Sequence, residues 1–425
     1  MRSAILALVA LAGPALPAGA GLGGTVTVLG VWGGQELDAF HEMVKPFEAQ
    51  TGVRVAFAGT RDLDAVLTTR VAAGNLPDLA VLPGPAKLAE LAAQGKLVDL
   101  ATVLDMTELR AAYGPDWIAL GSANHHLLGI FAKAALKGLV WYRPQALKDA
   151  HVQVPESLDQ LMGESGSLAA RGTTPWAMGL ESGSTSGWAG ADWLETLFLR
   201  MYGPEVYTDW YQGRLAWTSS EMRAAWQAWG RIAGDPAMVY GGSPYVLSTA
   251  FGHAFAPVFQ DPPRALLHFQ GSFIQAFIRK QFPKLIPGED FDFFPFPAIR
   301  PEFARAVVVA GDLLAMFRRT PQSEAFVRYL ASAPAQAFWA RTASGLSANR
   351  NVPLDLYPDP VSRKAAAVLT QAQGAVFGAG DMMPSEMSRA FWSACMSFVA
   401  NPADLDAILA ALETVRKDAY QLPGN

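Results

Sequence analysis

Residues 25–32 read TVTVLGVW and open the stretch that decides the fold. Apolar, mostly β-branched residues dominate it, which predicts a strand ending at Trp32. Residues 35–50 then place apolar side chains at helical spacing, and residues 53–58 return to a strand pattern. A strand, a helix and a second strand in this order form a βαβ unit.

The same alternation continues along the chain. A helix is predicted over residues 64–73 and a buried strand over residues 78–82, which Pro83-Gly84-Pro85 ends. Strands alternating with helices indicate an α/β fold with a parallel, doubly wound sheet. Further strands are predicted over 139–142, 176–180, 265–269, 307–310 and 313–317, and helices over most of 189–285, 321–330, 334–341 and 360–420.

Composition limits the class of protein. With 425 residues the chain is long enough for two or three domains, and 51% hydrophobic and 17% charged residues are typical of a globular protein. A net charge of −5 and the lack of a basic stripe argue against nucleic acid as a partner.

The first 20 residues have the pattern of a secretory signal peptide. Arg2 precedes an apolar run, and Ala18-Gly19-Ala20 fits a cleavage site. The single cysteine, Cys395, lies far from that site, so we expect no lipid anchor, no disulfide and a buried thiol. We therefore expect an exported protein that is free in the periplasm.

The stretch from Thr173 to Phe277 interleaves tryptophans with carboxylates, serines and glycines. The C–H face of a sugar ring packs on an aromatic ring, while its hydroxyls need fixed polar partners. The composition of this stretch predicts a carbohydrate-binding cleft.

Several motifs occur in a fixed order along the chain: TRDLDAVLTTRVAAGNLPDLAVLPGP, KGLVWYRPQAL, TPWAMGLESGSTSGWAGADWLE, DPPRALLHFQGSFIQAF, AGDLLAMF and GDMMPSEMSRAFW. Together they resemble the extracellular solute-binding proteins of carbohydrate ABC importers, most closely the α-glucoside-binding subgroup. The resemblance covers residues from about 25 to 420.

The resemblance implies a two-lobed periplasmic binding protein fold of type II-like form, with a ligand cleft at the hinge. By analogy residues 24–136 and 307–348 form an N-lobe, and residues 137–306 and 349–425 form a C-lobe. The loaded, closed form would dock on a membrane permease driven by ATP. The receptor itself would be monomeric and carry no cofactor, and the chain has no P-loop motif.

Candidate ligand contacts begin at the ends of the first two strands, where ligands of open α/β sheets gather. Trp32 is interpreted either as a stacking ring or as packing between loops, and Glu36 either as a hydroxyl acceptor or as an acid of the first helical turn. Thr60, Arg61 and Asp62 offer a donor fork beside an acceptor, with helix capping by Asp62 as the alternative.

The glycine-rich loop 182–187 leads into the second group of candidates. Ser186 lies in this loop, and Trp188 and Asp192 lie four residues apart, on one face of a helix, where they could grip one sugar unit. Trp176 and Trp193 are interpreted as core residues.

The last candidates come from the second half of the chain. Gly271 and Phe273 follow an apolar strand, and Phe273 occupies a place where the resembling family has a stacking aromatic. Asp312 interrupts an apolar run and must be paired or reach the cleft. In the family Asp381 and Trp392 face the hinge, although Trp392 could equally be core.

The chain departs from the subgroup between Lys133 and Lys137, where Ala135 replaces an acidic residue, and at Gly138, where a serine is usual. No catalytic or metal motif was found. His41-Glu42 lacks the second histidine of a zinc helix, and the loop around Thr185 resembles a nucleophile elbow in shape only.

Three functions are compatible with these observations. The first is a non-enzymatic receptor for an α-glucoside or another small oligosaccharide. The second is a receptor for a sugar–glycerol or sugar–glycerate conjugate, with Arg61, Lys133 and Lys137 recognising an anion. The third is a secreted glycoside hydrolase, whose paired acids would come from Asp62, Asp192, Asp312 and Asp381.

Overall fold

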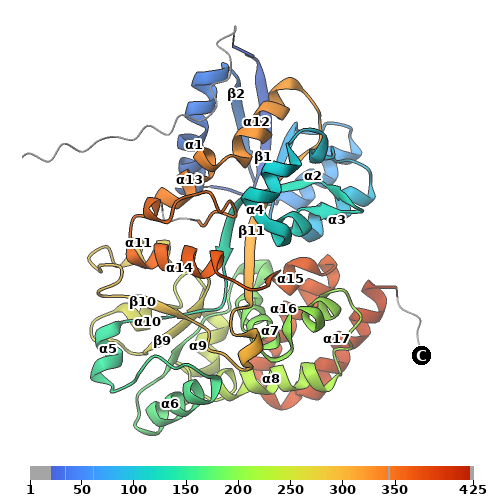
Figure 1. Cartoon of the computed structure of the whole chain (residues 1–425). Helices are drawn as coiled ribbons and strands as arrows, with labels where there is room; N and C mark the ends of the chain where they lie inside the picture. The colour runs from blue at the N-terminus through green and yellow to red at the C-terminus, as the bar shows by residue number, and fades with distance from the viewer. Residues whose placement is uncertain (1–20, 34, 61, 343–344, 422–425) are drawn as a thin grey trace, which may run out of the picture.

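The structure, a computed structural model, describes residues 21–33, 35–60, 62–342 and 345–421. Figure 1 shows two lobes stacked end to end, each with a sheet covered by helices. This confirms the predicted two-lobed α/β fold. The predicted signal peptide, residues 1–20, lies outside the described residues.

The sheet of the first lobe has six strands in the order β12-β11-β3-β1-β2, with β6 also paired to β11. β1 is parallel to β2 and to β3, as the βαβ pattern predicts. The expectation of an all-parallel sheet is wrong, because β11 runs antiparallel to β3 and to β6. The strands are β1 (Thr25–Gly30), β2 (Arg54–Gly59), β3 (Leu79–Leu82), β6 (Gly129–Leu136), β11 (Val307–Met316) and β12 (Ala375–Phe377).

The antiparallel strand has a physical origin. β11 reaches this sheet from the second lobe and not through a βα crossover, so the crossover rule does not fix its direction. The two predicted runs around Gly311-Asp312 form this one strand, with a register shift against β6 between Asp312 and Leu313.

The second lobe contains a four-stranded sheet in the order β10-β7-β9-β8. Its strands are β7 (Leu139–Tyr142), β8 (Trp176–Ala177), β9 (Leu267–Gln270) and β10 (Asp292–Pro295). β8 is shorter than the predicted strand 176–180, because the chain turns toward the loop that precedes α7. A separate ribbon joins β4 (Ser122–Ala123) and β5 (His126–Leu127) in the first lobe.

Helices surround both sheets (Figure 1). The first lobe carries α1 (Gln35–Thr51), α2 (Leu63–Ala72), α3 (Pro85–Ala93), α4 (Met106–Leu120), α12 (Pro321–Ala331) and α13 (Ala333–Thr342). The second carries α5 (Pro144–Asp149), α6 (Leu158–Ala170), α7 (Trp188–Tyr211), α8 (Ser220–Ala233), α9 (Gly242–Ser248), α10 (Ala256–Phe259), α16 (Ser385–Ala400) and α17 (Leu405–Ala419). α11 (Ile274–Gln281), α14 (Pro360–Thr370) and α15 (Ala379–Met382) lie near the junction.

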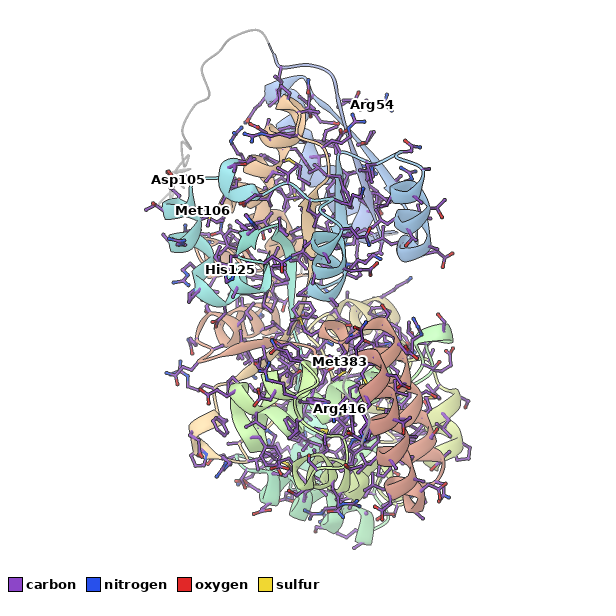
Figure 2. The ribbon with its side chains drawn as sticks, turned by 90° about the vertical axis from the view of Figure 1, so that its right-hand side faces the viewer. Arg54, Asp105, Met106, His125, Met383 and Arg416 are labelled. Carbon is purple, nitrogen blue, oxygen red and sulfur yellow. The ribbon has the colours of Figure 1, made fainter. Side chains whose placement is uncertain are left out.

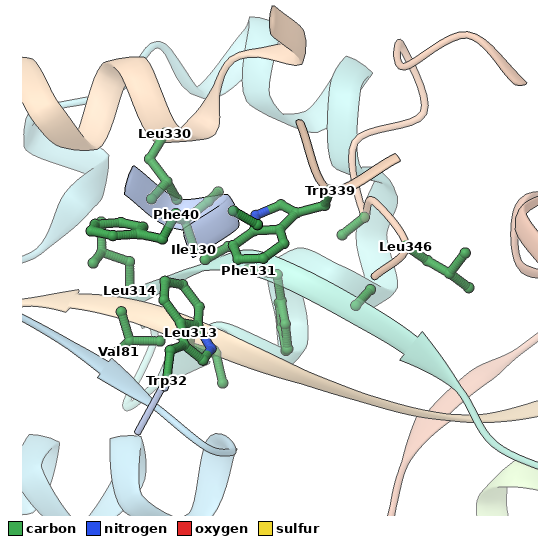
Figure 3. Packing of buried hydrophobic residues seen from close by; sticks show 14 of the residues in the cluster. Trp32, Phe40, Val81, Ile130, Phe131, Leu313, Leu314, Leu330, Trp339 and Leu346 are labelled. Atoms are coloured by element: carbon green, nitrogen blue, oxygen red, sulfur yellow. The ribbon is translucent and has the colours of Figure 1, made fainter. Parts of the chain in front are cut away.

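Two apolar cores stabilise the lobes. In the first, Trp32 packs against Phe40 and Trp339 with ring centroids 5.3 Å and 5.1 Å apart (Figure 3). The second is rich in tryptophan and includes Trp176 and Trp193, which are fully buried as the core interpretation predicts. Cys395 is also buried there, so its thiol is a core group.

The lobes meet along β6, β11 and the segment from β12 to α15. Seen from the side, Arg54 and Asp105 lie in the first lobe and Met383 and Arg416 in the second (Figure 2). β12 lies within the tail that was assigned to the C-lobe, yet it pairs with β11 in the first sheet. The predicted lobe boundaries stay a prediction. None of the described helices combines the length and apolarity that crossing a membrane requires.

A buried tyrosine anchors this junction. The Tyr207 hydroxyl on α7 donates a hydrogen bond to Phe377 O at 3.1 Å and accepts one from Ala379 N at 2.8 Å. It therefore connects the start of α15 to α7 of the second lobe.

We expect Tyr207→Phe to lower the free energy of unfolding by about 1–3 kcal/mol, because a buried N–H and C=O lose their partner. Chemical denaturation measures this change. Tyr211→Phe, on the same helix and half-buried, is the matched control and should change stability by a few tenths of a kcal/mol. Equal losses in both variants would contradict the anchoring role.

Candidate functional site

A cavity of about 710 Å³ opens between the lobes, within the size range of ligand sites. β6 and β11 form its floor. Trp32 and Glu36 of the first lobe and Trp188, Phe251 and Phe273 of the second contribute to its walls. A smaller cavity of about 210 Å³ adjoins it and shares the side chains of Lys137, Trp188 and Asp381.

Two lysines flank an alanine along the floor of the cavity. Lys133 and Ala135 are alternate residues near the end of β6, and Lys137 directly follows the last residue of this strand, so the alternation places all three side chains on the same face. Ala310 and Asp312 lie opposite Ala135 and Lys133 on β11. The two lysines are roughly 13 Å apart along the strand, from about 3.3 Å per residue. Between them lies a shallow strip of small residues.

Each lysine is surrounded by carboxylates. The Lys133 cluster consists of Lys133, Glu36, Asp312 and Trp32. Lys133 Nζ contacts Glu36 and lies 3.4 Å from Asp312 Oδ2, which also accepts a hydrogen bond from Trp32 Nε1 at 2.8 Å. Burial alone would lower the pKa of Lys133, but Asp312 and Glu36 outweigh it and raise that pKa above its ordinary value.

The Lys137 cluster consists of Lys137, Asp192, Glu195 and Asp381. Lys137 Nζ lies 2.7 Å from Asp192 Oδ1, 3.4 Å from Asp381 Oδ2 and 3.8 Å from Glu195 Oε2. Burial opposes the charge of Lys137, and the three carboxylates overcome it and hold its pKa well above the ordinary value.

The acids of this cluster differ in exposure. The side chains of Asp192 and Glu195 are 3% and 2% exposed, whereas that of Asp381 is 37% exposed and lines both cavities. Burial raises the pKa of Asp192 and of Glu195 despite the nearby lysine. The two clusters together contain five carboxyl groups and two ammonium groups, so neither lysine is left free to bind an anion.

Aromatic rings form the opposite wall. Trp188 meets Phe251 and Phe273 at centroid distances of 4.9 Å and 6.0 Å, and Phe251 meets Phe277 at 5.8 Å. Trp392 lines the inner cavity beside Trp188. The cavity therefore offers apolar faces on one side and charged acceptors on the other, which is the arrangement that sugar binding requires.

The structure brings together seven of the candidates predicted from sequence: Glu36, Trp188, Asp192, Phe273, Asp312, Asp381 and Trp392 all line a cavity. Trp32 also borders the main cavity but is only 1% exposed. Its packing with Trp339 favours the alternative that it is a packing residue, which reaches the site through its hydrogen bond to Asp312.

Four other candidates lie outside the residues that line either cavity: Thr60, Asp62, Ser186 and Gly271. Asp62 is exposed and makes no side-chain cap. Ser186 Oγ donates to Gly183 O at 2.8 Å, so this hydroxyl holds the loop in shape, and Thr185 lines the inner cavity in its place. Arg61 lies outside the described residues.

Other residues that line the cavities are not predicted from the sequence as ligand contacts, or are predicted to have another role. The sequence predicts Lys133 and Lys137 only as binders of an anion, and their carboxylate partners correct that interpretation. Glu195 lies three residues after Asp192, on the same helix face, a spacing that the sequence does reveal. Phe251 and Phe277 come from separate segments, and only the tertiary fold shows them together.

The loop that carries Trp188 depends on glycine. Gly187 has φ +101°, and a Cβ there would lie 1.9 Å from Trp392 O. Gly183, in the same loop, has φ +58° and open space around its Cβ position. The close approach at Gly187 holds Trp188 against α16.

We expect Gly187→Ala to destabilise the protein clearly more than Gly183→Ala. Both changes add the strain of a left-handed residue, about 1–2 kcal/mol. Only the change at Gly187 forces a backbone to move, because its Cβ meets a carbonyl. Thermal unfolding of both variants measures the difference, and equal effects would contradict the packing role of Gly187.

Among the described residues, no group of histidine, cysteine and acidic side chains is arranged to hold a metal ion.

Comparison with known proteins agrees with this geometry. Residues 33–337 match the family model described as bacterial extracellular solute-binding protein. The osmoprotective compounds-binding protein GgtB of Synechocystis sp. is 35% identical over 91% of this chain and 91% of its own. The α-glucosides-binding periplasmic protein AglE of Rhizobium meliloti is 32% identical over 90% and 85%. A chitin oligosaccharide binding protein shares the fold, with a TM-score of 0.79 at 18% identity, over 94% of this chain and 100% of its own. The chain therefore belongs to the bacterial extracellular solute-binding proteins, which are receptors and not enzymes, and this confirms the family predicted from its motifs.

Proposed function

We propose that this protein is the substrate-binding receptor of an ABC importer and that it binds a neutral α-glucoside or glucosyl polyol between its lobes. The aromatic wall around Trp188, facing a floor of lysine–carboxylate clusters, is the observation that carries this proposal. A sugar ring would pack on the aromatic wall while its hydroxyls donate hydrogen bonds to the carboxylates.

The charge of the clusters supports a neutral ligand. An anionic conjugate such as glucosylglycerate would bring a carboxylate next to Asp312 or Asp381, whose lysines are already paired. Lys280, which also lines the cavity, lies apart from both clusters, near the end of α11. Like charges at such short distances are unfavourable, most of all when water is excluded. A hydroxyl has no such penalty, because it donates to a carboxylate and accepts from a lysine.

The spacing of the clusters supports a ligand with two hydroxyl-bearing units. With Lys133 and Lys137 about 13 Å apart along β6, one sugar ring cannot reach both clusters at once. The small side chains of Ala135 and Ala310 leave room for the link between two units. Glucosylglycerol and glucose disaccharides both have this form.

The names of the relatives agree with this range of ligands. One is named for osmoprotective compounds and the other for α-glucosides. A glucosylated polyol belongs to both chemical classes. The fold also supports the transport role, because lobes joined by crossing strands can close around a ligand and present one surface to a membrane permease.

Binding to purified protein tests the proposal. A thermal-shift and calorimetric panel should include glucosylglycerol, trehalose, maltose, sucrose, isomaltulose, glucose and glucosylglycerate. We expect a saturable rise in melting temperature with at least one neutral two-unit glucoside. We also expect at least tenfold weaker binding of glucose and of glucosylglycerate. No binding by any neutral glucoside would refute the proposal, and tightest binding by glucosylglycerate would refute its neutrality.

We expect Trp188→Ala to weaken binding of the best glucoside by tenfold or more, about 1.4 kcal/mol, because the central ring of the aromatic wall is lost. Isothermal titration calorimetry measures the change. Trp117→Ala removes another half-buried tryptophan that lies outside the cleft, and it should leave the affinity within about threefold. Equal losses in both variants would mean that Trp188 acts only through stability.

A further inference from the structure

Two buried oxygens in the Lys137 cluster have no hydrogen-bond partner. They are Asp192 Oδ2 and Glu195 Oε2. Their residues are 2% and 1% exposed and lie three positions apart on one face of α7. An unpartnered carboxylate oxygen in a dry environment is costly.

The other oxygens of these two groups are already engaged. Asp192 Oδ1 lies 2.7 Å from Lys137 Nζ, and Glu195 Oε1 accepts a hydrogen bond from Gly380 N at 2.9 Å. Lys137 is 3.8 Å from Glu195 Oε2, too far for a hydrogen bond. One proton on either of these two carboxyl groups would remove one of the negative charges that Lys137 alone does not balance.

We propose that Asp192 and Glu195 hold one proton as a pair, and that Glu195 is a positioning residue of the cleft, which holds Gly380 through its other oxygen. Through Gly380 it fixes α15, which presents Asp381 to both cavities. This inference rests on the proposed function only in taking Asp381 and Asp192 to be ligand acceptors.

The surroundings of Glu195 contain few groups that could replace this proton. Lys137 at the end of β6, Asp192 on its own helix and Asp381 on α15 are the charged groups near it. Tyr207 on α7 and Cys395 on α16 face it as neutral titratable groups, since burial raises the pKa of both. Without the proton the cluster has three negative charges against one positive charge, and with it the net charge is −1.

The direction of the pKa shifts agrees with the geometry. Burial raises the pKa of Glu195 and of Asp192, while Lys137 opposes the shift in each case. A group whose pKa is raised by folding keeps its proton in the folded state at a pH where the unfolded chain has lost it. Its contribution to stability is therefore complete at acid pH and is lost as the pH rises toward the folded pKa.

Glu195→Gln tests the shared proton without any ligand. The amide keeps an acceptor for Gly380 N, but it does not titrate. Chemical denaturation at pH 5, 6 and 7 gives the folding equilibrium constant of each protein. We expect the folding equilibrium constant of the variant, divided by that of wild type, to rise with pH by up to about tenfold per pH unit. Only the wild type has Glu195 to take up a proton on folding, so its stability falls more steeply as the pH rises.

Glu205→Gln, an exposed position on the same helix, is the control, and its ratio should not change across this range. A ratio for Glu195→Gln that is independent of pH would overturn the shared proton. This outcome does not depend on which solute the protein binds, so it is separate from a failure of the proposed function.

Ligand affinity tests the positioning role, with glucosylglycerol and trehalose as probes at pH 6.5. We expect Glu195→Gln to bind within about threefold of wild type and Glu195→Ala, which leaves Gly380 N without an acceptor, to bind at least tenfold more weakly. Equal affinities of the alanine and glutamine variants would overturn the role. If Glu195→Ala does not fold, a wild-type-like affinity of Glu195→Gln supports the role, and a tenfold loss in that variant overturns it.

Discussion

The structure depends on burying two lysines in the cleft between the lobes: Lys133 of β6, and Lys137 directly after this strand. An ammonium group that leaves water loses several kcal/mol of hydration, and only nearby carboxylates in good geometry offset this loss. Lys133 receives its partners from α1 and β11, and Lys137 receives its partners from α7 and α15. Elements far apart in sequence are thereby held at fixed places along β6. The ion pairs and the backbone of β6 together position the side chains that form the floor of the cleft.

The same requirement explains features that look unrelated. α7 starts at a left-handed glycine so that Trp188, Asp192 and Glu195 lie on one face, at spacings of four and three residues. α15 is a single turn held by Tyr207 and by Glu195, which leaves the carboxylate of Asp381 near Lys137. These contacts anchor α15 to the second lobe, while β12, just before it, pairs with the first sheet. The segment around α15 therefore connects both lobes at the point where a hinge motion would act.

Sequence patterns predicted the fold well wherever local rules decide it. The βαβ unit, the α/β class and the core positions of Trp176 and Trp193 follow from periodicity and burial. The direction of β11 could not be predicted, because the chain enters this strand from the second lobe and no βα crossover links it to its partners β3 and β6. Within the site, residue type and sequence context predicted Trp188 and Asp312 as candidate ligand contacts. They could not predict which residues surround these two side chains. Lys137 appeared as a free cation because its three carboxylate partners lie 55, 58 and 244 residues away.

The proposed neutral ligand suits a floor whose two lysines are paired with carboxylates. Free lysines would attract any anion, and free carboxylates would attract cations. Pairing with carboxylates occupies both lysines and leaves the floor with a net negative charge, so the floor disfavours anions and keeps strong donors and acceptors at short range. A sugar hydroxyl, which both donates and accepts, can use both members of a pair at once. Closure of the lobes would remove water and strengthen these hydrogen bonds, so the free energy of binding would couple directly to the closed form.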